Sequence, residues 1–267
     1  MQISVQSQAA FIYTGGRPFD RSRPVVVLLH GAQHDHSVWI MQSRWLAHHG
    51  YAVLAPDLPG HGRSAGPPRP DIASMAAWVL DLLTALGVTR AVVAGHSMGS
   101  LISLELAGIA PDGCRGLGLI GTAFPMKVST ALLDAARSRE PDALDMINRF
   151  SHARWVHPPG TPGPGFSVLV QNLRLMQRQA PGVLLNDFQA CDAYADGLTR
   201  AKSLRCPVLF VLGERDAMTP PRAAQPLIDA CTQSSVCRVP QAGHALMSET
   251  PEAVRLALAN WLPSLAD

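Results

Sequence analysis

Five short apolar segments recur along the chain, and none of them alternates apolar with polar positions. A strand with one face in water would show that alternation, whereas a continuous apolar run of this length is typical of a strand covered on both faces. The pattern therefore predicts a parallel sheet with helices on both sides. The segments are Val25–Leu29, Tyr51–Ala55, Ala91–Ala94, Leu117–Ile120 and Val208–Leu212.

Longer stretches with helical periodicity separate these segments. One helix is predicted from Met75 to Leu86, with Asp71 or Ser74 as its N-cap and Gly87 at its C-terminal cap. Another follows Ser97 and ends before Pro111, and a last one opens at residues 248–251. Alternation of strands and helices predicts a doubly wound α/β domain. The first 24 residues, which contain a Gly-Gly pair at 15–16, predict a preceding antiparallel hairpin.

Residues 123–204 break this rhythm and predict a helical lid inserted into an α/β core made of residues 1–122 and 205–267. The inserted segment carries many bulky apolar side chains, which suit the wall of a substrate pocket. Its centre, residues 157–165, is so rich in Pro and Gly that it predicts a loop. Four short helices are expected in the insertion, at Leu132–Arg139, Ala143–Phe150, Val168–Gln179 and Leu184–Tyr194.

Composition excludes several classes of partner. The 22 basic and 20 acidic residues are spread along the chain, and this argues against a nucleic-acid or anionic-membrane surface. No apolar run approaches the roughly 20 residues of a membrane span, and the first residues lack the features of a signal peptide. Five cysteines, an odd number without C-x-x-C spacing, indicate reduced thiols. We therefore expect a soluble cytoplasmic protein.

The clearest chemical motif is Gly95-His-Ser97-Met-Gly99, a G-x-S-x-G sequence. It directly follows a predicted strand and directly precedes a predicted helix. A sharp turn between two such elements exposes the serine hydroxyl, and small residues on either side avoid clashes. Ser97 is therefore a candidate nucleophile at a helix N-terminus, where developing negative charge is favoured.

Four further motifs accompany this one, each after a predicted strand or near the C-terminus: His30-Gly31, Asp57–Ser64, Gly213–Asp216 and Gly243-His244. In this order the five motifs resemble those of the α/β-hydrolase family. The resemblance covers the chain except its first twenty or so residues and the insertion. It implies an α/β-hydrolase fold and a serine hydrolase that needs no metal or organic cofactor.

The resemblance implies Ser97 as nucleophile, His244 as base and Asp216 as the acid that orients the base, in the family order. The chemistry agrees, because a serine hydroxyl needs a base to take its proton and the imidazole needs a carboxylate to hold its tautomer. Glu214 lies in the same loop as Asp216 and is the less favoured acid.

For the oxyanion, family position implies the backbone N–H groups of Met98 and Ala32, with Gln33 as the alternative to Ala32. His30 is expected to support this loop. We also name His30, Gln33, Phe124 and Trp155 as candidate substrate contacts.

Other histidines compete with His244 for the role of the base. His34 and His36 follow the first motif and are expected near the site. A metal role for this pair is disfavoured, because the sequence indicates no third ligand nearby. His61 lies in the Asp57–Ser64 loop, for which the resemblance implies a structural role.

Epoxide opening and dehalogenation are not expected, because members of the resembled family that carry out these reactions have Asp at the position of Ser97. Ala245, rather than Trp, follows His244 and lowers the case for a carbon–carbon bond hydrolase. We expect cleavage of small to medium, largely apolar carboxylic esters. The alternatives are a carbon–carbon bond hydrolase or haloperoxidase-like relative with the same three residues, and a slow-turnover ligand sensor. The sequence does not predict the natural substrate or the oligomeric state.

Overall fold

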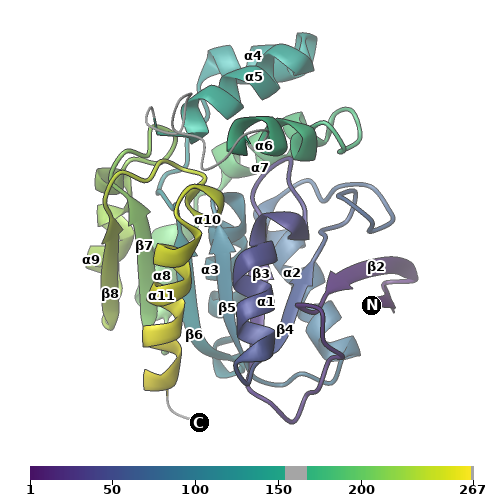
Figure 1. The fold of residues 1–267 in the computed structure, drawn as a ribbon, viewed down its shortest axis with the longest axis vertical. Helices are drawn as coiled ribbons and strands as arrows, with labels where there is room; N and C mark the ends of the chain where they lie inside the picture. The colour runs from purple at the N-terminus through teal and green to yellow at the C-terminus, as the bar shows by residue number, and fades with distance from the viewer. Residues whose placement is uncertain (154–166, 266–267) are drawn as a thin grey trace.

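The computed structural model describes residues 1–153 and 167–265, and its centre is one mixed sheet of order β1-β2-β4-β3-β5-β6-β7-β8 (Figure 1). The strands from β3 to β8 run parallel, and β1 and β2 are antiparallel additions at one edge. The α/β-hydrolase fold expected from the motifs is thereby confirmed. The strands are β1 Gln2–Val5, β2 Gln8–Tyr13, β3 Val25–Leu29, β4 Ala52–Pro56, β5 Ala91–His96, β6 Cys114–Ile120, β7 Val208–Gly213 and β8 Ser234–Val239.

The central strands are apolar throughout because helices cover both faces of the sheet. In β3, Val25, Val27 and Leu29 pack in a cluster with α2 and α3, while Val26 and Leu28 pack on the other face with α1 and α11. Every residue of β3 is consequently buried. The helices of these two layers are α1 Ile40–His48, α2 Ile72–Ala85, α3 Met98–Ile109, α8 Gly197–Ser203, α9 Gln225–Ala230, α10 Leu246–Glu249 and α11 Pro251–Trp261.

The predicted helix signals are present at the ends of α2. The side chain of Asp71 accepts a hydrogen bond from the Ser74 N–H and so caps the first turn. Gly87 follows the C-cap with φ +66°, the left-handed conformation that ends many helices. Local polar signals of this kind were readable from the sequence.

Two elements differ from what the sequence pattern indicates. The N-terminal hairpin turns at Gln6 and Ser7, which both have positive φ, and the Gly15-Gly16 pair lies after β2 instead. β8 was not predicted, because it is an edge strand whose first five residues are exposed or half-buried and carry no apolar run.

Helices α4 to α7 lie above the end of the sheet at which the parallel strands finish (Figure 1). They have a small apolar core of their own, which includes Leu144, Met176 and Phe188. α8 follows them in the chain, but it packs beside α3, where Arg200 pairs with Glu105. The bounds are α4 Thr130–Ser138, α5 Glu140–Ser151, α6 Val168–Met176 and α7 Val183–Ala193. The predicted Pro/Gly loop at 157–165 lies outside the described residues.

Within the described residues, the helices are too short or too polar to cross a bilayer.

β5 and α3 approach each other unusually closely at Gly95 and Gly99. A Cβ on Gly95 would lie 2.0 Å from the Gly99 carbonyl oxygen and 2.5 Å from Ser103 Oγ. A Cβ on Gly99 would lie 2.4 Å from the Leu29 carbonyl oxygen. Both positions therefore require glycine for lack of space, which is the physical meaning of the two outer residues of the G-x-S-x-G motif.

We expect Gly95→Ala to lower the free energy of unfolding by about 3 kcal/mol, because the new methyl group overlaps backbone that cannot move aside. Urea unfolding followed by circular dichroism measures the change. Gly113→Ala is the matched control, since its Cβ would meet only the Thr89 carbonyl oxygen at 3.3 Å, and it should cost under about 1 kcal/mol. Equal losses in the two variants would contradict the close-approach explanation.

Candidate active site

Ser97 is the single residue between β5 and α3, and its backbone is strained. Its φ of +53° and ψ of −120° are values that L-residues rarely adopt. The conformation is held by hydrogen bonds on both sides, from the Ser97 N–H to the Ile120 carbonyl at 3.0 Å and from the Ser100 N–H to the Ser97 carbonyl at 2.8 Å. Within the part of the chain that is described, the Ser97 hydroxyl makes no hydrogen bond, so no partner restrains its rotation.

Asp216 and His244 come together from two loops beyond β7 and β8. His244 Nδ1 lies 2.8 Å from Asp216 Oδ2, and both side chains are buried. Asp216 Oδ1 accepts the N–H groups of Met218 and Thr219 at 2.8 and 2.7 Å, and the Thr219 hydroxyl lies 2.7 Å from Asp216 Oδ2. The carboxylate is thus fixed on both oxygens, and it fixes the imidazole in turn. Glu214, the alternative acid, is exposed.

The residue before Ser97 connects the elbow to His244. The His96 ring lies 4.6 Å from the His244 ring, and its Nε2 is 2.8 Å from the His244 carbonyl oxygen. Gly121, after β6, brings its backbone against both rings, because a Cβ there would lie 3.3 Å from His244 Nδ1. These contacts place the His244 loop beside the end of β5, from which Ser97 projects.

The loop after β3 packs directly on Ser97. A Cβ on Gly31 would lie 3.2 Å from Ser97 Cβ. The N–H groups of Ala32 and Met98 donate to no other group among the described residues, whereas the Gln33 N–H is 2.9 Å from Asp187 Oδ2. Ala32 and Gln33 were the two candidates for the second oxyanion donor. The Ala32 N–H is available to donate to an oxyanion, whereas the Gln33 N–H already donates to Asp187.

A cavity of about 960 Å³ opens beside these groups, and its lining includes residues of helix α6 as well as residues of the α/β core. His96 and His244 form part of its wall, together with His34. Apolar side chains among the rest of the described lining come from the turn before α1, from α1, from α6 and from the region of α10: Val38, Ile40, Met41, Val168, Val170, Leu175, Ala245, Met247 and Pro251. Polar side chains, which include those of Arg174 and Arg178, make up the remainder.

Three of the four candidate substrate contacts are buried outside the described cavity lining, and the fourth is not described by the structure. His30, Gln33 and Phe124 are buried and are absent from the described lining of the cavity. His30 donates to the Gly31 carbonyl and accepts the Leu58 N–H, so it supports the loop. Phe124 packs in the core against Tyr194. Trp155 lies outside the described residues. Of the two histidines expected near the site, His34 lines the cavity and His36 is absent from its described lining.

Comparison with known proteins gives the family. Residues 24–251 match the family model described as the alpha/beta hydrolase fold. The chain belongs to this family. Its solved relatives include the enol-lactonase of Burkholderia xenovorans LB400, with a TM-score of 0.85 and 22% identity over 99% of this chain and 100% of that one.

Curated relatives of this α/β hydrolase are also similar over most of its length. It is 30% identical to the pimeloyl-[acyl-carrier protein] methyl ester esterase of Chromobacterium violaceum, over 91% of this chain and 96% of the relative. It is 31% identical to the dihydrolipoyllysine-residue acetyltransferase component of the acetoin cleaving system of Pseudomonas putida. That match covers 86% of this chain but only 60% of the longer relative.

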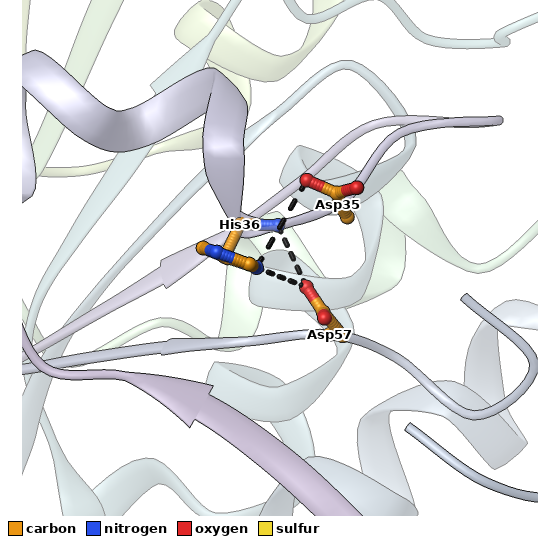
Figure 2. A group of neighbouring side chains, drawn as sticks. All are labelled: Asp35, His36 and Asp57. Carbon is orange, nitrogen blue, oxygen red and sulfur yellow. Dashed lines mark hydrogen bonds and ion pairs between the residues drawn. The ribbon is translucent and has the colours of Figure 1, made fainter. Parts of the chain in front are cut away.

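Asp35, His36 and Asp57 form a cluster in the segments that follow β3 and β4, and their ligand-type atoms all lie within 4.8 Å of one another (Figure 2). Asp57 accepts the His36 N–H at 2.8 Å and its Nδ1–H at 2.7 Å, and it also accepts the Arg63 N–H. Asp35 accepts the Ser37 N–H and the Arg178 guanidinium. All four carboxylate oxygens are therefore engaged by the chain, and the cluster ties the loops of this hydrolase together.

Charge explains why the Asp35 carboxylate remains ionised there. Burial acts to raise its pKa, but the hydrogen bonds from Ser37 and the Arg178 charge outweigh burial and hold the pKa at about 2.

The structure reveals two residues of the site region that the sequence reading did not single out. Thr219 holds Asp216, and the short D-x-x-T spacing was its only signal. Glu249 on α10 accepts the N–H groups of Gly243 and Ala153 at 3.1 and 2.9 Å, so it joins the His244 loop to the chain after α5. Burial raises the pKa of Glu249. No local sequence pattern indicates that Glu249 contacts the chain after α5, because Ala153 lies 96 residues away.

The burial of His30 predicts a pH dependence of stability. Desolvation, with the nearby His61 charge, lowers the His30 pKa from 6.5 to about 4. Between pH 6.5 and pH 4, the imidazole of His30 is protonated in the unfolded chain and neutral in the folded chain. The contribution of His30 to the free energy of unfolding is therefore fully present above pH 6.5 and is lost as the pH falls toward 4. The loss attributable to His30 is about 3 kcal/mol.

The check compares urea unfolding of wild type and His30→Gln at pH 7 and at pH 4. The variant lacks the titrating ring, so its unfolding free energy should fall by about 2–3 kcal/mol less than that of wild type over this interval. Parallel decreases in the two proteins would show that His30 is not the group responsible.

Proposed function

We propose that this α/β hydrolase is a serine esterase that cleaves small to medium, largely apolar carboxylic esters through an acyl-enzyme at Ser97. The observation that carries the proposal is the buried Asp216–His244 pair, 2.8 Å apart. His244 lines the cavity together with His96, the residue that precedes the strained Ser97. Strain of this kind persists only where the surroundings enforce it, and it concentrates at functional sites.

In the first half of the reaction, Ser97 Oγ attacks the ester carbonyl carbon while His244 Nε2 takes the hydroxyl proton. Asp216 holds the other imidazole nitrogen and stabilises the imidazolium that forms. The carbonyl oxygen becomes negative and accepts hydrogen bonds from the N–H groups of Ala32 and Met98, which have no competing acceptor among the described residues. His244 then gives its proton to the alcohol oxygen as the C–O bond breaks.

In the second half, a water molecule replaces the alcohol. His244 removes a proton from this water as its oxygen attacks the acyl carbon, and the same two N–H groups stabilise the second tetrahedral intermediate. When the intermediate collapses, the proton passes to Ser97 Oγ and the carboxylic acid leaves. The cycle restores the starting enzyme without any cofactor.

The cavity supports the substrate class. Val38 and Leu175 are among the apolar residues that line the cavity, and such a wall favours hydrocarbon on the acyl or alcohol group. The size of the cavity, about 960 Å³, suits small to medium ligands. A methyl ester is the substrate class named for one curated relative. A cytoplasmic location fits the five cysteines, which are all free thiols.

We expect purified protein to hydrolyse short-chain p-nitrophenyl esters and Ser97→Ala to lose at least about 10³-fold in kcat, because the nucleophile is removed. A fluorophosphonate probe should label wild type and leave Ser97→Ala unlabelled. Ser138→Ala, at the exposed end of α4, is the matched control and should behave as wild type.

The proposal would be contradicted if wild type hydrolysed several esters no faster than Ser97→Ala and was not labelled by the fluorophosphonate probe. Stabilisation by an ester without turnover would then favour the ligand sensor.

A further inference from the structure

The lid reaches the oxyanion loop through one buried carboxylate. Asp187 lies on α7, is fully buried, and places its Oδ2 2.9 Å from the Gln33 N–H. The same oxygen is 2.9 Å from His61 Nε2, in the loop after β4. A single lid residue therefore binds two loops of the core, the loop that follows β3 and the loop that follows β4.

The contact at Gln33 acts on the peptide next to the candidate oxyanion donor. Gln33 has φ +59°, a conformation that costs free energy for a residue with a side chain. The Ala32–Gln33 peptide is held at both ends, because its N–H donates to Asp187 and its C=O lies 2.7 Å from His34 Nδ1. The Ala32 N–H belongs to the preceding peptide, whose C=O accepts hydrogen bonds from His30 Nδ1 at 2.9 Å and from the His34 N–H at 3.3 Å. Because the peptide planes on both sides of Ala32 are held, its two backbone dihedrals and the direction of its N–H are restricted.

Both supports of this peptide lead to the lid. Asp187 belongs to α7, and the other ring nitrogen of His34 lies 2.9 Å from Asn172 Oδ1 on α6. Asn172 in turn donates to Asn148 on α5. The lid therefore contributes to the oxyanion loop from three helices, although none of its side chains needs to touch the reacting atoms.

His61 supplies the charge that makes a buried carboxylate tolerable. Its side chain is buried, and its Nδ1 lies 3.0 Å from the Pro59 carbonyl oxygen. Burial acts to lower the pKa of His61, but the Asp187 charge and its hydrogen bond outweigh burial, so the pKa is raised. The imidazolium can donate from both nitrogens, which matches the two acceptors that face it.

We propose that Asp187 is a positioning residue: with His61 as its counter-ion, it holds the Ala32–Gln33 peptide so that the Ala32 N–H faces the oxyanion formed at Ser97. This inference rests on the proposed esterase function. It makes the lid a structural part of the oxyanion hole as well as a wall of the substrate cavity.

The role predicts a specific kinetic signature. The Ala32 N–H binds the charge that develops on the carbonyl oxygen, and this charge is present in the transition state and nearly absent in the bound substrate. Misdirecting this N–H should lower kcat and leave KM nearly unchanged. A residue that merely stabilised the lid or shaped the pocket would instead change stability or KM.

Asp187→Asn tests the proposal, because the amide has almost the same shape but no charge to hold His61 protonated. We expect kcat for a p-nitrophenyl ester to fall about 10- to 100-fold, with KM within about twofold of wild type. Binding of a trifluoromethyl ketone, which mimics the tetrahedral intermediate, should weaken by a similar factor.

Glu105→Gln is the matched control. Glu105 is also a buried carboxylate that ties the core to a later helix, but its partners are Arg200 and Tyr194 and not residues of the oxyanion loop. This variant should lose stability while its kcat and its trifluoromethyl ketone affinity stay within about twofold of wild type.

Three outcomes overturn the inference: an unchanged kcat in Asp187→Asn, a rise in KM alone, or an equal fall of kcat in Glu105→Gln. If Asp187→Asn does not fold, His61→Gln carries the test, with a kcat decrease of about fivefold or more and unchanged KM expected. Failure of the proposed function is distinct, since wild type itself would then lack ester hydrolysis and fluorophosphonate labelling.

Discussion

The close approach of β5 to α3 is the constraint on which the site depends. Gly95 and Gly99 let the strand and the helix meet with no room for a Cβ between them, and this leaves a single residue to make the turn. That residue, Ser97, takes a strained conformation, and its Cβ lies against the loop after β3. Burial of the flanking strand and helix offsets the cost of the strain, because the apolar contacts of β5 and α3 are lost if the turn relaxes.

Around this turn, the polar groups are arranged so that almost every buried charge has a partner. Asp216 is held by Thr219 and by His244, and Asp35 by Arg178. Buried carboxylates are costly unless hydrogen bonds replace their water. The consequence is a set of loops at one edge of the sheet that are connected to one another and to helices α6 and α7 through side chains rather than through regular secondary structure.

The fold and the core of the candidate site were readable from the sequence, since both depend on local patterns. Apolar runs predicted five strands, and the G-x-S-x-G motif lay at a strand–helix junction as expected. Edge strand β8 and helix α8 lacked such signals. The substrate contacts proposed from the sequence were less successful, because His30 and Phe124 turned out to be buried supports while His34 reaches the cavity.

The sequence by itself determined the order of elements and the glycines of the tight turn, because these follow from periodicity and short-range spacing. The three residues proposed for catalysis came from the resemblance of five motifs to those of the α/β-hydrolase family. Only the tertiary structure decided which loop N–H groups stay available and which side chains line the cavity. Asp187 shows the reason: it lies 154 residues from Gln33, and nothing near either residue in the chain records their contact. Long-range polar pairing depends on how the lid sits on the core, and no local pattern encodes it.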